Sequence, residues 1–229
     1  MTPRFSLPAR APMLLLSLLA VVLLPLAALA AGKPRLPAGP APVAGSDYIE
    51  IDGGQPYAPA KGKIEVVEVF GYTCPACARF EPLVAAWKAR QPADVKFVPL
   101  AAPFGGMWTP YAKAFYTADS LGLVGKSHAA MFRALHEEGS LPKSQPSVDE
   151  IAGFYARFGA DPGRFANAFA SAAIAARLQQ ADQFIRRSGV EHTPTLVVAG
   201  KYRVTGASPA DNLRIAEHLV ARERAAKRR

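Results

Sequence analysis

The chain has 229 residues, of which 50% are hydrophobic and 20% charged, with a formal net charge of +9. That length allows one domain of ordinary size, or a small domain carrying an insertion, and it is too large to depend on disulfide staples. Much of the positive charge lies in the tail from Arg222 to Arg229, which no aromatic residues interleave. We interpret this tail as a solvated helix end, and we expect no nucleic-acid partner.

Residues 1–30 are predicted to be a signal peptide. Arg4 and Arg10 give a positive start, Met13–Leu29 is apolar, and Ala28-Leu29-Ala30 supplies small residues for cleavage. The apolar run is long for a signal, so an uncleaved membrane anchor is the alternative. In either case we expect the rest of the chain to be exported.

Residues 31–46 are rich in proline, alanine and glycine and are predicted to be a linker. The alternative is a short extended arm on the edge of the domain. Globular sequence is expected from about Asp47, and residues 47–108 form the first part of the domain.

In that part, Ile64–Phe70 is almost continuously apolar and β-branched, which is typical of a central strand covered on both faces. Residues 75–90 have the apolar spacing of a helix that contains Pro82. Residues 94–100 are a second strand. Two parallel strands joined by a helix make a βαβ unit.

Residues 109–187 are predicted to be an all-helical insertion of four or so helices. Ser147 and Glu150 make a capping box, and Asp161-Pro162 begins a helix whose apolar spacing continues to Leu178. We interpret the aromatic residues of this block as core.

Residues 188–229 complete the domain. Strands are predicted at 195–198 and 201–204, with Ala199-Gly200 between them, and Ser208-Pro209 begins the last helix. The expected order is therefore βαβ, a helical block, then ββα, an α/β fold.

The only cysteines, Cys74 and Cys77, lie two residues apart between the predicted strand and the helix. The N–H groups and positive dipole at a helix start favour the thiolate of the first cysteine. A disulfide closing so short a loop would stabilise the fold little. The pair therefore indicates redox chemistry, with Cys74 as nucleophile, Cys77 as the buried resolving thiol and Pro75 stiffening the first turn. The alternative is a chance pair of buried thiols.

Two further features accompany the pair. Glu68 lies inside the apolar strand, where it is either a buried proton acceptor for Cys77 with a raised pKa, or an edge carboxylate that meets water. Thr193-Pro194 precedes a strand, so the proline belongs at the strand start, in the cis or trans form. His192 either adds positive charge near Cys74 or is an ordinary surface residue. The other histidines lack the spacing of zinc ligands, and we expect no metal.

These motifs resemble the exported thioredoxin-fold oxidoreductases of the DsbA type. The resemblance is carried by the segment Glu68–Cys77, by Val190–Val198 around Thr193-Pro194, by residues 200–203, and by the helical block between the two halves. It implies a thioredoxin fold with an inserted all-helical domain, a cis Pro194 facing the cysteines, and backbone hydrogen bonds from Thr193 to an extended substrate. It also implies a redox-active disulfide in place of a cofactor, a periplasmic location, disulfide donation to reduced secreted proteins, and reoxidation by a membrane protein of the DsbB type.

Two residues depart from the family pattern. Ala76 stands where the best-known members have a histidine that stabilises the thiolate, which predicts a weaker oxidant, between DsbA and thioredoxin. Pro99 falls where some members carry a lysine that partners the buried acid.

The alternatives to disulfide donation are a reductase or isomerase fed by a membrane reductant, and a thiol-based copper-binding assembly factor, for which Met107 and His192 are loose candidate ligands.

Overall fold

The computed structural model describes residues 1–2 and 37–228 of the chain. The predicted signal peptide, apart from its first two residues, lies outside the described residues. Among the described residues, no helix combines the length and the apolar character needed to cross a membrane.

Five strands of the described chain form one mixed sheet in the order β1-β5-β4-β2-β3. Their bounds are β1 Tyr48–Glu50, β2 Ile64–Phe70, β3 Val95–Ala101, β4 Thr195–Val198 and β5 Tyr202–Val204. Strand β2 pairs in parallel with β3 and antiparallel with β4, while β5 lies antiparallel to both β4 and β1. All seven residues of β2 are buried, as the continuous apolar run predicts.

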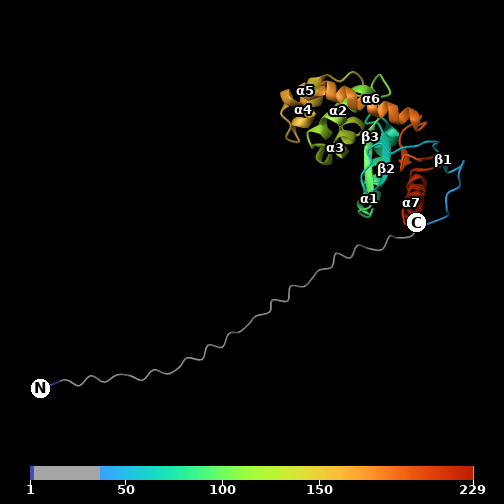
Figure 1. The fold of residues 1–229 in the computed structure, drawn as a ribbon. Coiled ribbons are helices and arrows are strands. Elements are labelled where there is room, and N and C mark those ends of the chain that lie inside the picture. Colours follow the sequence, from blue (N-terminus) through green and yellow to red (C-terminus); the bar gives the residue numbers. More distant parts are fainter. Residues whose placement is uncertain (3–36, 229) are drawn as a thin grey trace. The chain divides into compact units, whose positions relative to one another are not determined.

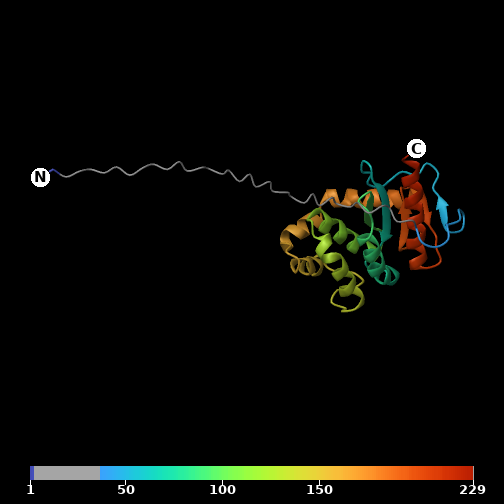
Figure 2. The same ribbon diagram turned by 90° about the horizontal axis from the view of Figure 1, so that it is seen from below.

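Two groups of helices cover the sheet. Helices α1 (Pro75–Ala89) and α7 (Pro209–Ala226) pack on the face that carries Val66, through residues such as Trp87 and Leu219. The opposite face, with Val67 and Val69, belongs to the core of the helical block. That block contains α2 (Trp108–Ser120), α3 (Val124–His136), α4 (Val148–Ala156), α5 (Pro162–Phe169) and α6 (Ala172–Arg187). Figure 1 shows α2–α5 gathered together, away from α7 and β1, while α6 runs from them toward the strands, and Figure 2 shows the same arrangement from below.

The expected order of βαβ, helical block and ββα is confirmed, as is the capping box of Ser147 and Glu150 at the start of α4. Strand β1 was not expected from the sequence, because three residues are too few to show a period of two. The single helix expected from Asp161 to Leu178 is wrong. Ser171 caps a new helix by accepting a hydrogen bond from the Ile174 N–H, so the block has five helices, not four or so, in the described chain.

The segment expected to be a linker is described from residue 37 onward, and there it contacts α7. The Arg214 side chain donates a hydrogen bond to the carbonyl of Pro40, and His218 Nε2 lies 3.3 Å from the carbonyl oxygen of Ala38. Ala44 also bridges to Tyr48 at the start of β1. Residues 37–46 therefore follow the edge of the domain as an arm.

Candidate active site

The two cysteines lie where β2 ends and α1 begins. Cys74 is the residue before the first helical turn, with extended backbone (φ −81°, ψ 118°), and Pro75 occupies the first turn. No side chain caps this end of α1, so its N–H groups are free to face the Cys74 sulfur. Both cysteines carry free thiols; Cys74 keeps 9% of its surface exposed and Cys77 has none exposed.

This placement gives the two sulfurs opposite acidities. The pKa of Cys74 is lowered to about 5, first by the Cys77 thiol that hydrogen-bonds to it, then by the nearby Thr193 side chain and the N–H groups of Cys77 and Ala76. Burial raises the pKa of Cys77 well above its ordinary value, and its hydrogen bond to Cys74 adds to the shift. At neutral pH the reduced pair is a Cys74 thiolate beside a protonated Cys77.

The loop before β4 forms the other wall of the site. The Thr193–Pro194 peptide bond is cis, and the Cys74 sulfur lies 3.6 Å from the Thr193 carbonyl oxygen. Thr195 begins β4 and donates its hydroxyl to the carbonyl of His192 at 2.8 Å. The structure thus brings Thr193 and Pro194 to the cysteines, from 119 residues away along the chain.

His192 does not join this cluster. It is exposed, and no hydrogen bond or ion pair links its side chain to Cys74 within residues 37–228. Pro75 is also exposed, at the outer edge of the first helical turn. The structure shows only that both side chains are exposed, and a substrate-binding role for them stays a prediction.

Glu68 is buried, with 2% of its surface exposed, so the edge-carboxylate alternative is wrong. Its pKa is raised to about 8, mainly by burial and then by the negative charge of Glu81, while Lys88 opposes the shift. Glu65, on the opposite face of β2, accepts hydrogen bonds from the Tyr57 and Ala58 N–H groups, both at 2.7 Å. No hydrogen bond of this kind reaches Glu68 from the residues that the structure describes.

Exposed apolar side chains lie near the loop that leads to Cys74. A Cβ added to Gly71 would fall 2.0 Å from the Trp108 ring, so this ring packs directly on the loop that leads to Cys74. Next to Trp108, Phe104 is 39% exposed and Met107 is 44% exposed. Large exposed apolar residues that lie together often mark a protein-binding surface.

Sequence reasoning missed a polar network behind this loop. Tyr72 contacts both His128 and His136 of α3, and His128 also contacts Glu81 of α1. The one signal available was the spacing of the two histidines, about two helical turns apart in a segment with helical periodicity. Within the described ranges, no group of three or more His, Cys, Asp or Glu side chains could hold a metal ion.

A CxxC pair at a helix N-terminus, beside a cis proline that directly precedes strand β4, defines a thiol–disulfide oxidoreductase of the thioredoxin fold. A family model described as "DSBA-like thioredoxin domain" matches residues 108–216, which span the helical block and most of the second part of the domain.

The thiol:disulfide interchange protein DsbA of Pseudomonas aeruginosa is 39% identical over 186 residues, covering 80% of this chain and 86% of the relative. The DsbA of Pseudomonas syringae pv. tomato is 36% identical, with shares of 80% and 85%. Among solved structures, oxidoreductase DsbA from Xylella fastidiosa has a TM-score of 0.79 and 50% identity, covering 80% of this chain and 98% of that one. The chain belongs to the DsbA family of protein-disulfide oxidoreductases, and its fold is the thioredoxin fold with a helical insertion.

Proposed function

We propose that this chain, exported to the periplasm through residues 1–30, donates a Cys74–Cys77 disulfide to reduced secreted proteins. The observation that supports donation of the disulfide to a substrate is the low pKa of Cys74, about 5, beside a Cys77 whose pKa is raised. A stabilised thiolate favours the reduced pair over the disulfide, so the disulfide form is an oxidant. The name and resemblance of the relatives support the same direction.

The chemistry proceeds in two exchanges. A substrate thiolate attacks the Cys74 sulfur, which breaks the bond to Cys77 and forms a mixed disulfide. Cys77 leaves as a thiolate and takes up a proton, for which Glu68, protonated below about pH 8, is the proposed source. The second substrate thiolate then attacks the substrate sulfur of the mixed disulfide, and Cys74 leaves as the stabilised thiolate. Two electrons now reside on the Cys74–Cys77 dithiol, and the substrate holds a new disulfide.

The neighbouring residues have proposed binding roles. The Thr193 backbone, beside the Cys74 sulfur, offers hydrogen bonds to an extended substrate segment, and Pro194 presents it toward the cysteines. The exposed Phe104 and Met107 supply apolar contact, with Pro75 and His192 at the outer edge. We propose that a membrane protein of the DsbB type takes the two electrons and restores the disulfide.

The equilibrium of the pair with a glutathione series tests the direction. A potential near or above roughly −180 to −210 mV supports disulfide donation. A value near that of thioredoxin, roughly −270 mV, overturns it in favour of a reductase. Strong one-to-one binding of Cu(I) by the reduced chain, surviving thiol competitors, would instead favour an assembly factor.

The Cys77→Ser variant tests the assigned roles of the two cysteines. Without the resolving thiol, mixed disulfides should accumulate at Cys74, where mass spectrometry can locate them. The matched Cys74→Ser variant should trap none, because its remaining thiol is fully buried. Equal trapping by both variants contradicts the assignment.

A further inference from the structure

The loop between β2 and Cys74 is held by two histidines of the helical block. Tyr72, in this loop, is 1% exposed, and its hydroxyl lies 2.8 Å from Nδ1 of His128. Its carbonyl oxygen is 2.7 Å from Nε2 of His136, which donates to it. Helix α3 therefore holds Tyr72 by both its side chain and its backbone.

The second ring nitrogen of His128 reaches a different element. Nε2 lies 3.3 Å from Oε2 of Glu81, which is on α1 one turn after Cys77. The side chains of His128 and Glu81 are each 16% exposed, so water competes weakly for these contacts. His128 thus joins three elements: the loop that precedes Cys74, the helix that carries Cys77, and α3.

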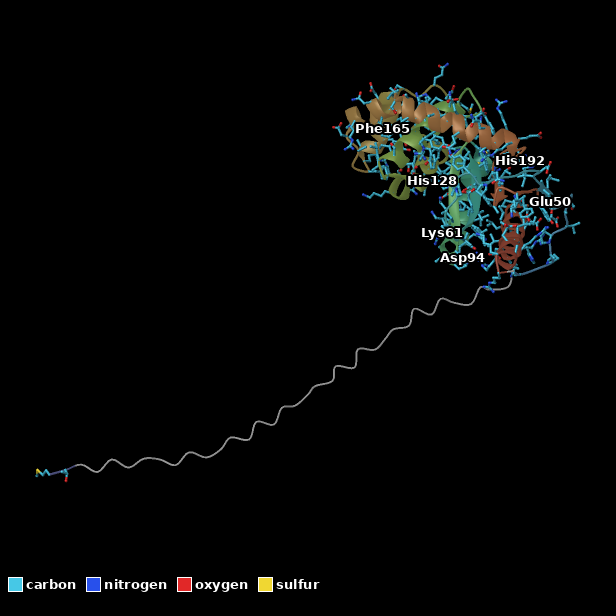
Figure 3. The ribbon with its side chains drawn as sticks, viewed as in Figure 1. Glu50, Lys61, Asp94, His128, Phe165 and His192 are labelled. Atoms are coloured by element: carbon cyan, nitrogen blue, oxygen red, sulfur yellow. The ribbon has the colours of Figure 1, made fainter. Side chains whose placement is uncertain are left out.

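The ring of His128 is also fixed in place by aromatic neighbours. The centroid of Phe70 lies 5.0 Å from that of His128, and those of Tyr72 and Phe132 lie at 5.2 and 5.3 Å. Figure 3 shows His128 where the helical block approaches the sheet. A ring enclosed in this way gives its two nitrogens defined directions.

We propose that His128 is a positioning residue of the redox site, which ties the Tyr72 hydroxyl to the Glu81 carboxylate and so fixes the geometry of the loop and helix around Cys74 and Cys77. This inference rests on the proposed function of the pair. Tyr72 precedes Cys74 by two residues and Glu81 follows Cys77 by four, so the two contacts of His128 bracket the CxxC segment.

This geometry matters because the Cys74 thiolate depends on groups from both the loop before it and the first turn of α1. The N–H groups of Ala76 and Cys77 come from the first turn of α1, whereas Cys74 itself is placed by the loop, where its own N–H donates to Gly71 at 3.1 Å. A small shift between loop and helix lengthens the hydrogen bonds to the sulfur, and hydrogen bonds weaken quickly with distance and misalignment. Losing His128 should therefore make the thiolate less stable.

The test compares His128→Phe with wild type in the full chain. Phenylalanine keeps an aromatic ring among Phe70, Tyr72 and Phe132 but removes both nitrogens. We expect the pKa of Cys74, followed by thiolate absorbance, to rise. The equilibrium with glutathione should move toward the disulfide form of this protein by about tenfold for each unit of that rise. The His218→Phe variant, on α7, is the matched control and should change neither quantity.

Two further variants separate positioning from packing. His128→Gln restores a donor and an acceptor and should recover part of the shift. In a Tyr72→Phe, Glu81→Gln background, His128→Phe should have a smaller effect than in wild type, because the groups it ties together are already gone. A His128→Phe protein that melts at a lower temperature but keeps the wild-type Cys74 pKa and glutathione equilibrium overturns the proposal, and so does a Gln variant that behaves like Phe.

The proposal and the function on which it rests fail in different ways. Thiolate absorbance needs no substrate, so the effect of His128 on Cys74 can be measured even if the chain donates no disulfide. Conversely, trapping of mixed disulfides by Cys77→Ser tests donation without involving His128.

Discussion

Pro99 lies directly opposite Glu68 in the register between the parallel strands β2 and β3. A proline is tolerated there because β3 is an edge strand of the sheet, where a missing N–H is least costly. The consequence is that the buried carboxyl faces a position with no charge and no donor. No charge at this position offsets burial and the negative Glu81, which raise the pKa of Glu68 to about 8 against the opposing charge of Lys88.

A lysine at position 99 should reverse this shift. In Pro99→Lys the ammonium group can approach Glu68, and an opposite charge within a few ångströms lowers the pKa of a carboxyl by roughly one to three units. Carboxyl-carbon NMR of the labelled protein over a pH series measures the change. Pro99→Met, of similar length but uncharged, is the control; a Glu68 pKa that is equal in the two variants would show that the register position does not govern it.

Glu68 should also make stability depend on pH. Its pKa is 4.5 in the unfolded reference and about 8 in the folded protein, so between these values the folded state holds a proton that the unfolded chain has released. The contribution of Glu68 to the free energy of unfolding therefore falls as pH rises through this window, by about 1.4 kcal/mol per unit of pKa difference at most. Glu68→Gln should gain stability relative to wild type from pH 5 to pH 8, roughly the span of the window. Urea denaturation at several pH values tests this, and parallel curves for the two proteins would contradict it.

Ala76 offers a direct way to change the redox balance. It lies between the cysteines, half-buried, and contributes only its N–H to the stabilisation of the thiolate. Ala76→His should lower the pKa of Cys74 below about 5 and make the protein more oxidising, by about 30 mV for each tenfold change in the equilibrium. Thiolate absorbance and glutathione equilibria measure the two effects. The control Ala76→Phe, which adds a ring without charge, should change neither the Cys74 pKa nor the glutathione equilibrium. A Cys74 pKa that stays constant or rises in the histidine variant would contradict this prediction.

Gly71 is required by the packing of Trp108. A Cβ at this position would lie 2.0 Å from Cζ3 of the indole ring, so Gly71→Ala forces the loop or the ring to move. We expect a loss of about 1–3 kcal/mol in the free energy of unfolding, with some of it recovered by adding Trp108→Leu. Gly153→Ala is the control, because its Cβ on α4 would meet open space. If both alanine variants unfold at the same denaturant concentration, the tight approach is not limiting.

Some features of the site can be predicted from the sequence because they depend on residues that are adjacent along the chain. The position of Cys74 at a helix start depends on the residues beside it, and the burial of Glu68 follows from the valines on both sides of it. The Tyr72–His128–Glu81 network could not be predicted in this way. Its members come from a loop and two helices, and only the tertiary packing of α3 against α1 brings them together.

The breaks between helices were equally hard to predict. Apolar spacing runs without interruption from α5 into α6, because both helices bury residues in the same core. The cap at Ser171 is therefore visible only once its hydrogen bond to Ile174 is seen. For the arm at residues 37–46, composition described a flexible segment, whereas its contacts are made by side chains of α7 that lie more than 170 residues later.

The unequal exposure of the two thiols determines where a mixed disulfide with a partner can form and how it can be broken. Any partner that becomes covalently attached must be attached at Cys74, because the Cys77 sulfur is sealed inside the protein. The group able to cut that attachment lies one helical turn away and belongs to the same molecule. In the proposed mechanism we therefore expect Cys77 to release a stalled partner from Cys74 without a second enzyme.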